Sequence, residues 1–163
     1  MSGYLTLISI GIRLMQLYLG SNMPKYMEQF VYYATCYLGL DKLRGEIVIN
    51  YKNRLEEESY GLCHGDRKEV EIQIARTTFG QSISREDKLK TIAHELTHAH
   101  QCLTGKMKTS TTGEEDEWFT HWKKRKYRYD PEGDETSKPW EVEAVKFENE
   151  IYACWLEDKD MHK

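Results

Sequence analysis

The stretch that decides the fold runs from residue 84 to residue 105 and reads SREDKLKTIAHELTHAHQCLTG. Ser84 is a residue type that caps helix N-termini, and Gly105 is typical of the position just after a helix ends. Between them apolar residues recur at spacings of three and four, which predicts an amphipathic helix with one buried face. The residues of that buried stripe are Leu89, Ile92, Ala93, Leu96, Ala99 and Leu103.

Within this helix residues 94–98 read HELTH, which has the pattern H-E-x-x-H. Helical residues four apart lie on one face about 6 Å apart along the axis, so the imidazoles of His94 and His98 can converge on one Zn²⁺ ion. Glu95 then lies beside the ion, where a carboxylate can take a proton from a zinc-bound water. His100 points to the other side of the helix, and we do not expect it to be a ligand.

A catalytic zinc ion takes three protein ligands and leaves a fourth position to water, so one more ligand must come from elsewhere in the chain. The downstream candidates are Glu141, Glu143 and His121. Ala144 follows Glu141 by three positions, and so small a residue would let this second helix approach the first closely. Glu143 lies on a different side of the same helix, so the two glutamates cannot both serve. The residues alone leave the three candidates open.

The HELTH segment followed by PWEVEA at residues 139–144 resembles the gluzincin pattern of zinc metallopeptidases, H-E-x-x-H and then E-x-x-A. The chain is similar in particular to small phage and bacterial metallopeptidase-like proteins with a P-W-E-x-E-A motif, over roughly residues 45–157. This resemblance implies that His94, His98 and Glu141 are the zinc ligands. It also implies that Glu95 is the catalytic base.

Two details qualify the resemblance. Val145 stands where some gluzincins carry an aspartate that orients a histidine, so that orientation has to come from another residue. The SprT-like proteases are a more distant comparison and use a third histidine, for which His121 is the counterpart here. They imply an association with DNA.

Pattern and resemblance together predict a zinc-dependent hydrolase, a peptidase acting on a peptide or protein, in which Glu95 activates a zinc-bound water. The tetrahedral intermediate of such a reaction needs a hydrogen-bond donor for its oxyanion. Tyr127, Tyr129 and His121 lie between the ligand elements, and we favour Tyr127. The alternatives are a catalytically inactive metal-binding domain with a regulatory or interaction role and a SprT-like, DNA-associated protease.

The rest of the chain predicts an α+β fold, a small zincin-like domain. A helix is expected over residues 24–38, and strand-like runs at residues 46–51 and 69–75 predict an antiparallel meander packed on the metal-binding helix. A C-terminal helix is expected to begin at Pro139. Strand 69–75 precedes the metal-binding helix, and the resemblance to metallopeptidases implies an edge strand there with which an extended substrate could pair; an ordinary sheet strand is the equal alternative.

The first 22 residues are expected to stand apart from a single metallopeptidase-like domain at residues 23–163. The segment from Tyr4 to Leu19 is apolar on all sides but short of the ~20 residues of a membrane span, and we expect a docked helix. An upstream extension is the second interpretation, because Met23 followed by Pro24 could be a start.

The chain has 163 residues and a formal net charge of −4, which argues against a dedicated nucleic-acid binder. The basic run at residues 123–128 permits nucleic acid as a partner. The acidic run at residues 114–117 balances it, and a solvated hairpin is the favoured interpretation. The four cysteines are widely spaced, which favours a reducing cytoplasm, the host's if a phage encodes the protein.

Overall fold

The computed structural model describes residues 15–111 and 118–161. Within them the helices are α1 (Lys25–Tyr37), α2 (Arg85–Leu103) and α3 (Pro139–Met161), with short 3-10 turns η1 (Leu40–Lys42) and η2 (Glu135–Ser137). The strands are β1 (Met15–Leu19), β2 (Gly45–Lys52), β3 (Gly61–Gly65), β4 (Glu69–Ala75), β5 (Thr77–Thr78), β6 (Gln81–Ser82), β7 (Met107–Thr111), β8 (Trp118–Trp122) and β9 (Arg125–Arg128).

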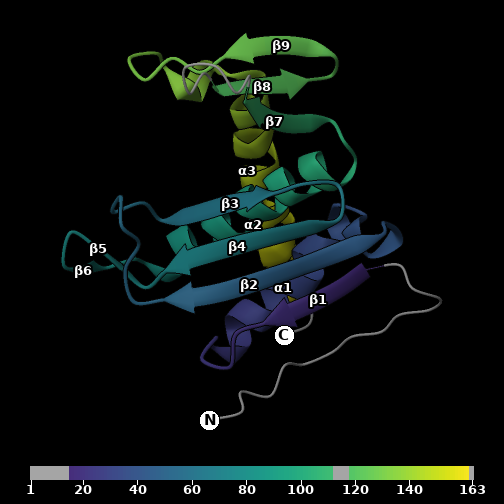
Figure 1. The fold of residues 1–163 in the computed structure, drawn as a ribbon. Helices are drawn as coiled ribbons and strands as arrows, with labels where there is room; N and C mark the ends of the chain where they lie inside the picture. Colours follow the sequence, from purple (N-terminus) through teal and green to yellow (C-terminus); the bar gives the residue numbers. More distant parts are fainter. Residues whose placement is uncertain (1–14, 112–117, 162–163) are drawn as a thin grey trace.

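The main sheet has the strand order β1-β2-β4-β3, and the helices lie behind one of its faces (Figure 1). Strands β1, β2 and β4 run parallel, while β3 runs antiparallel to β4. The short strands β5 and β6 form a hairpin between β4 and α2. The predicted α+β class is confirmed.

The predicted antiparallel meander is wrong, because β2 and β4 are parallel neighbours. After β2 the chain passes over one strand position to form β3. It then turns back, and β4 fills the position between β2 and β3. The register places Ile49 beside Ile72 and Tyr51 beside Ile74, so both strands bury their apolar rows against the helices. Strand alternation specifies the buried face but not the neighbouring strand.

Of the two interpretations of strand 69–75, the edge strand is wrong and the ordinary sheet strand is confirmed. As β4, this strand has β2 on one side and β3 on the other. Strand β3 forms the edge, and its residues are half-buried or exposed. A substrate that adds to this sheet beside α2 would therefore pair with β3.

The docked-helix interpretation is wrong for the described part of the N-terminal segment, because residues 15–19 form strand β1. Met15, Leu17 and Leu19 are buried in the same core as the helices. Buried and more exposed residues alternate along this segment, as they do in a strand. Its backbone groups form their hydrogen bonds with the free edge of β2. Residues 1–14 lie outside the described residues. Among the described helices, none is long and apolar enough to cross a membrane.

Helix α2 forms as its sequence predicts. The Ser84 hydroxyl accepts a hydrogen bond from the Asp87 N–H, and Gly105 follows the helix with φ +71°. The whole predicted stripe, from Leu89 to Leu103, is buried. The side of α2 that carries His94 and His98 is directed toward α3 and β3.

Strands β7, β8 and β9 form a separate antiparallel sheet, which lies above the β3 edge of the main sheet in the view of Figure 1. Trp122 of β8 packs against Trp140 in the first turn of α3, and both side chains are buried. This contact ties the small sheet to the start of α3, the turn that also carries Glu141.

Candidate metal centre

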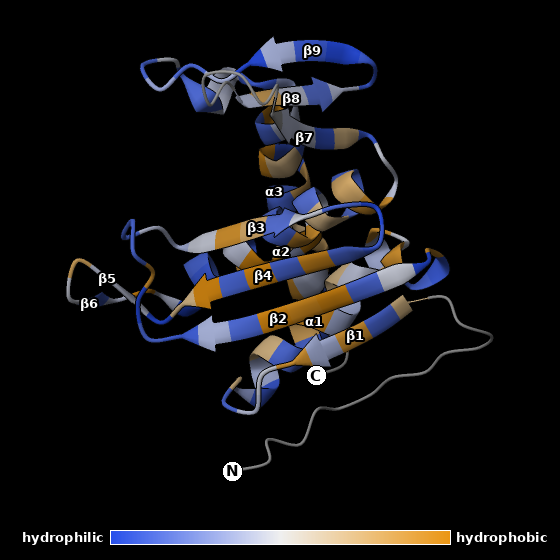
Figure 2. Ribbon diagram, viewed as in Figure 1, coloured by the Kyte–Doolittle hydropathy of each residue, from blue (hydrophilic) through white to orange (hydrophobic). Residues whose placement is uncertain are grey.

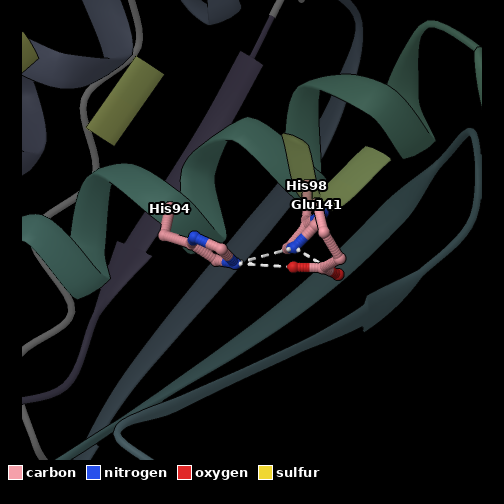
Figure 3. A group of neighbouring side chains, drawn as sticks. All are labelled: His94, His98 and Glu141. Atoms are coloured by element: carbon pink, nitrogen blue, oxygen red, sulfur yellow. Dashed lines mark hydrogen bonds and ion pairs between the residues drawn. The ribbon is translucent and has the colours of Figure 1, made fainter. Parts of the chain in front are cut away.

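Three side chains from two helices meet between α2 and α3. His94 and His98 project from α2, and Glu141 projects from the first turn of α3 (Figure 3). One ligand atom from each lies within 4.8 Å of those of the other two. The His94 Nε2 atom is 3.2 Å from Glu141 Oε2, and the His98 Nε2 atom is 3.2 Å from Glu141 Oε1. The structure thus brings together the three residues that the gluzincin resemblance implies as ligands.

Close packing of α3 on α2 makes this meeting feasible. Ala144 lies one turn after Glu141 and is fully buried. Because alanine has only a methyl side chain, the axes of two helices can come close at such a position. Ala144 therefore packs between α2 and α3, as its position three residues after Glu141 predicts.

The outer nitrogen of each imidazole is held by a polar side chain, the half-buried Glu148 for His94 and the buried Gln101 for His98. The Glu148 carboxylate lies 2.8 Å from His94 Nδ1, and the Gln101 side-chain oxygen lies 2.8 Å from His98 Nδ1. Gln101 is fully buried, and its Nε2 donates to the Trp140 carbonyl at 3.0 Å and to Glu143 at 3.0 Å. Since its amide group donates in both directions, its oxygen must accept from the His98 Nδ1–H.

This network assigns the tautomers of the two histidines. A proton on each Nδ1 leaves each Nε2 with a lone pair, and these two Nε2 atoms face one another at 3.1 Å. Two lone pairs and a carboxylate directed at one point repel each other unless a metal cation, or protons on the imidazoles, lie among them. The three donors therefore fit a divalent ion. A tetrahedral zinc ion with bonds of 2.0–2.1 Å requires its ligand atoms to be about 3.3 Å apart, close to the separations found here.

The electrostatics of the group agree with this donor set. Burial disfavours protonation of His94, yet hydrogen bonds to Glu141 and Glu148 raise its pKa to about 10. Burial also disfavours ionisation of Glu141, yet hydrogen bonds from His94 and His98 lower its pKa to about 2. The site therefore holds a carboxylate and favours positive charge beside it, which a metal cation would supply.

Glu95 opens onto a pocket that reaches one of the three donors, His94. The pocket has a volume of about 370 Å³, and His94 and Glu148 line it together with Tyr60 and Gly61 at the start of β3. Burial raises the pKa of the Glu95 carboxyl, while His98 and His94 act in the opposite direction. A carboxylate with a raised pKa is better matched to proton transfer near neutral pH.

The other ligand candidates have other partners. His121 on β8 is 3.1 Å from the Ser110 hydroxyl. Glu143 bonds to Gln101 and forms an ion pair with Lys106. Neither belongs to the group of metal-ligating side chains found among residues 15–111 and 118–161.

Tyr127, the favoured oxyanion donor, packs edge-on against Trp140 with ring centroids 5.3 Å apart. Tyr127 is not among the residues that line the pocket beside Glu95. The contact of Tyr127 with Trp140 helps to hold the β7–β9 sheet against α3. A catalytic role for Tyr127 stays a prediction.

Sequence reasoning missed Gln101 and Glu148. Glu148 lies seven residues after Glu141, which returns it to the same face of α3 after two turns. Gln101 lies three residues after His98 on α2. Helical spacing could have suggested both residues, but it could not show which imidazole each one contacts.

Comparison of this chain with protein-family models, with curated proteins and with solved structures finds no match.

Proposed function

We propose that this protein is a zinc-dependent hydrolase of gluzincin type that acts on peptides. The observation that carries the proposal is the convergence of His94 Nε2, His98 Nε2 and the Glu141 carboxylate, with both imidazoles oriented from behind. A purely structural zinc site is normally closed by four protein ligands, often cysteines. Three donors, one of which lines a pocket shared with Glu95, would leave a fourth position for water and substrate.

A bound zinc ion would supply a Lewis acid and a water of lowered pKa. The chain's own part in the chemistry then falls to Glu95. Its carboxylate lines the pocket next to His94 and would accept a proton from the attacking water, then pass it to the leaving amine. Gln101 and Glu148 would hold the two imidazoles in one tautomer throughout.

An extended peptide suits the wall of this pocket. The Ala75 N–H donates to the Tyr60 carbonyl, and the Asp66 N–H donates to the Glu69 carbonyl. In this antiparallel register the even-numbered residues 60–66 direct their backbone groups toward β4. Gly61 and Cys63 therefore direct theirs away from the sheet, where a peptide strand could pair beside Glu95.

The test is cleavage of unfolded casein and a mixed peptide library by zinc-loaded full-length protein. Glu95→Gln keeps the side-chain volume but removes the base, so cleavage should fall by about 10²–10⁴-fold while bound zinc is retained. Glu157→Gln, on an exposed turn of α3, is the matched control and should cut at the wild-type rate. Equal residual cleavage by wild-type and Glu95→Gln proteins would assign the activity to a contaminant. Zinc binding with no cleavage of any substrate would favour the inactive metal-binding alternative.

A further inference from the structure

The β7–β9 sheet concentrates positive charge in an otherwise acidic chain. Residues 106–111 and 118–128 contain seven lysines and arginines and no aspartate or glutamate, whereas residues 114–117 between them read EEDE and the whole chain has a formal net charge of −4. Strand β9 is among the most hydrophilic strands of the structure (Figure 2). The metal centre makes no use of this charge, apart from the contact of Lys106 with Glu143.

Strand alternation sorts the residues of this sheet onto two faces. Trp122 and Tyr127 pack against Trp140, so their face of the sheet looks toward the body of the protein. The intervening residues lie on the opposite face, where the register sets Lys108 beside His121 and His121 beside Lys126. Phe119 lies on that same face, and the Lys126 ammonium is 3.7 Å from its ring centroid.

The hairpin turn between β8 and β9 extends this surface. It consists of two exposed lysines, Lys123 and Lys124, with φ of 44° and 72°. A two-residue hairpin turn with both φ values positive favours Asn-Gly, because larger side chains are strained in that region. Lys124 adds a positive charge at the exposed tip, whereas the Lys123 ammonium lies 5.5 Å from the Trp122 ring centroid, on the face toward the body of the protein.

We propose that this outer face, defined by Lys108, Phe119, His121 and Lys126 and extended by Lys124 at the turn, binds single-stranded nucleic acid. Lysine ammonium groups neutralise backbone phosphates, which supplies affinity without sequence selectivity. Phe119 and His121 set flat rings among these cations, and unpaired bases stack on such rings. Paired bases in a duplex are not available for stacking, so the mixture of rings and ammonium groups favours a single strand. The proposal does not depend on the metal centre.

The test is fluorescence anisotropy of a labelled oligothymidine with the full-length protein over a range of salt concentrations. The logarithm of the binding constant should fall linearly with the logarithm of the salt concentration. The charge reversals Lys124→Glu and Lys126→Glu, made together, should weaken binding by about tenfold or more and flatten that slope by roughly one for each lost phosphate contact. Phe119→Leu should weaken binding while leaving the slope unchanged, because it removes a ring and no charge.

The matched control carries the same two charge reversals at Lys25 and Lys68, which are exposed on α1 and on the β3–β4 turn. It should bind as the wild type does, which separates local charge from net charge. Zinc content and thermal midpoint, measured on all variants, show that each is folded. Absence of binding, or equal weakening by the control, would overturn the proposal. So would tighter binding of a duplex of the same length, or capture by anionic phospholipid vesicles in place of the oligonucleotide.

Discussion

Gly61 and Glu95 lie so close that position 61 has no room for a side chain. A Cβ atom built on Gly61 would be 2.7 Å from Glu95 Oε1 and 2.6 Å from the Thr91 methyl carbon. Real Cβ atoms essentially never approach other heavy atoms so closely, so a larger residue would displace the carboxylate or push β3 away from α2. The absence of a side chain at the start of β3 therefore sets the position of the proposed catalytic base.

Gly61→Ala should lower hydrolysis strongly while zinc stays bound, because the methyl group collides with Glu95 and touches no ligand. The forced rearrangement should also cost about 1–3 kcal/mol of folding free energy. The measurements are kcat/KM, metal content and chemical denaturation. Gly20→Ala is the control, since its nearest contact of 3.4 Å is ordinary packing. A Gly61→Ala protein with wild-type rates would show that Glu95 does not act from this position.

Glu141→Ala should weaken zinc binding by at least about 100-fold, because it removes one of three proposed ligands. Glu143→Gln should leave the affinity nearly intact, since Glu143 faces Gln101 and Lys106. Competition with a chromogenic chelator measures both affinities. The reverse ranking would transfer the ligand role to Glu143, and zinc loss in His121→Ala alone would support the SprT-like alternative.

Glu148→Ala and Gln101→Ala should each weaken zinc binding by about 10–100-fold through loss of imidazole orientation. The two should differ in stability. Gln101 is fully buried and donates to the Trp140 carbonyl, so its loss leaves a buried acceptor unpaired at a cost of about 1–3 kcal/mol. Glu148 borders the pocket, and its loss should cost less. Chelator competition and denaturation on the same samples separate the two effects, and unchanged zinc affinity in both variants would refute the positioning role.

Leu17→Ala should destabilise the protein by about 2–5 kcal/mol, because Leu17 is buried between β1 and the helices. Gln16→Ala, on the exposed face of the same strand, should change stability by less than about 0.5 kcal/mol. A chain that starts at Met23 should be less stable than either variant, since it lacks all of β1. Urea denaturation of the metal-free proteins tests this, and equal stability of the Leu17 and Gln16 variants would contradict the strand assignment.

Local sequence was sufficient for α2, its caps, its buried stripe and the common face of His94 and His98. All of these follow from helical periodicity and from the capping preferences of Ser84 and Gly105, which depend on neighbours within a few residues. The start of α3 at Pro139 followed from the same kind of information. The grouping of Glu141 with the histidines was reached through the resemblance to gluzincins and not through spacing.

Tertiary structure alone decided which strands are neighbours, which strand forms the edge, and which groups hold the imidazoles. Residues 15–19 become a strand because the edge of β2 accepts them, and nothing within those residues specifies that partner. The hydrogen bond between Glu148 and His94 likewise exists only where α3 packs on α2. The spacing of apolar residues in the sequence indicates which face of a helix or strand is buried. Which other element packs against that face depends on contacts between residues far apart in the chain.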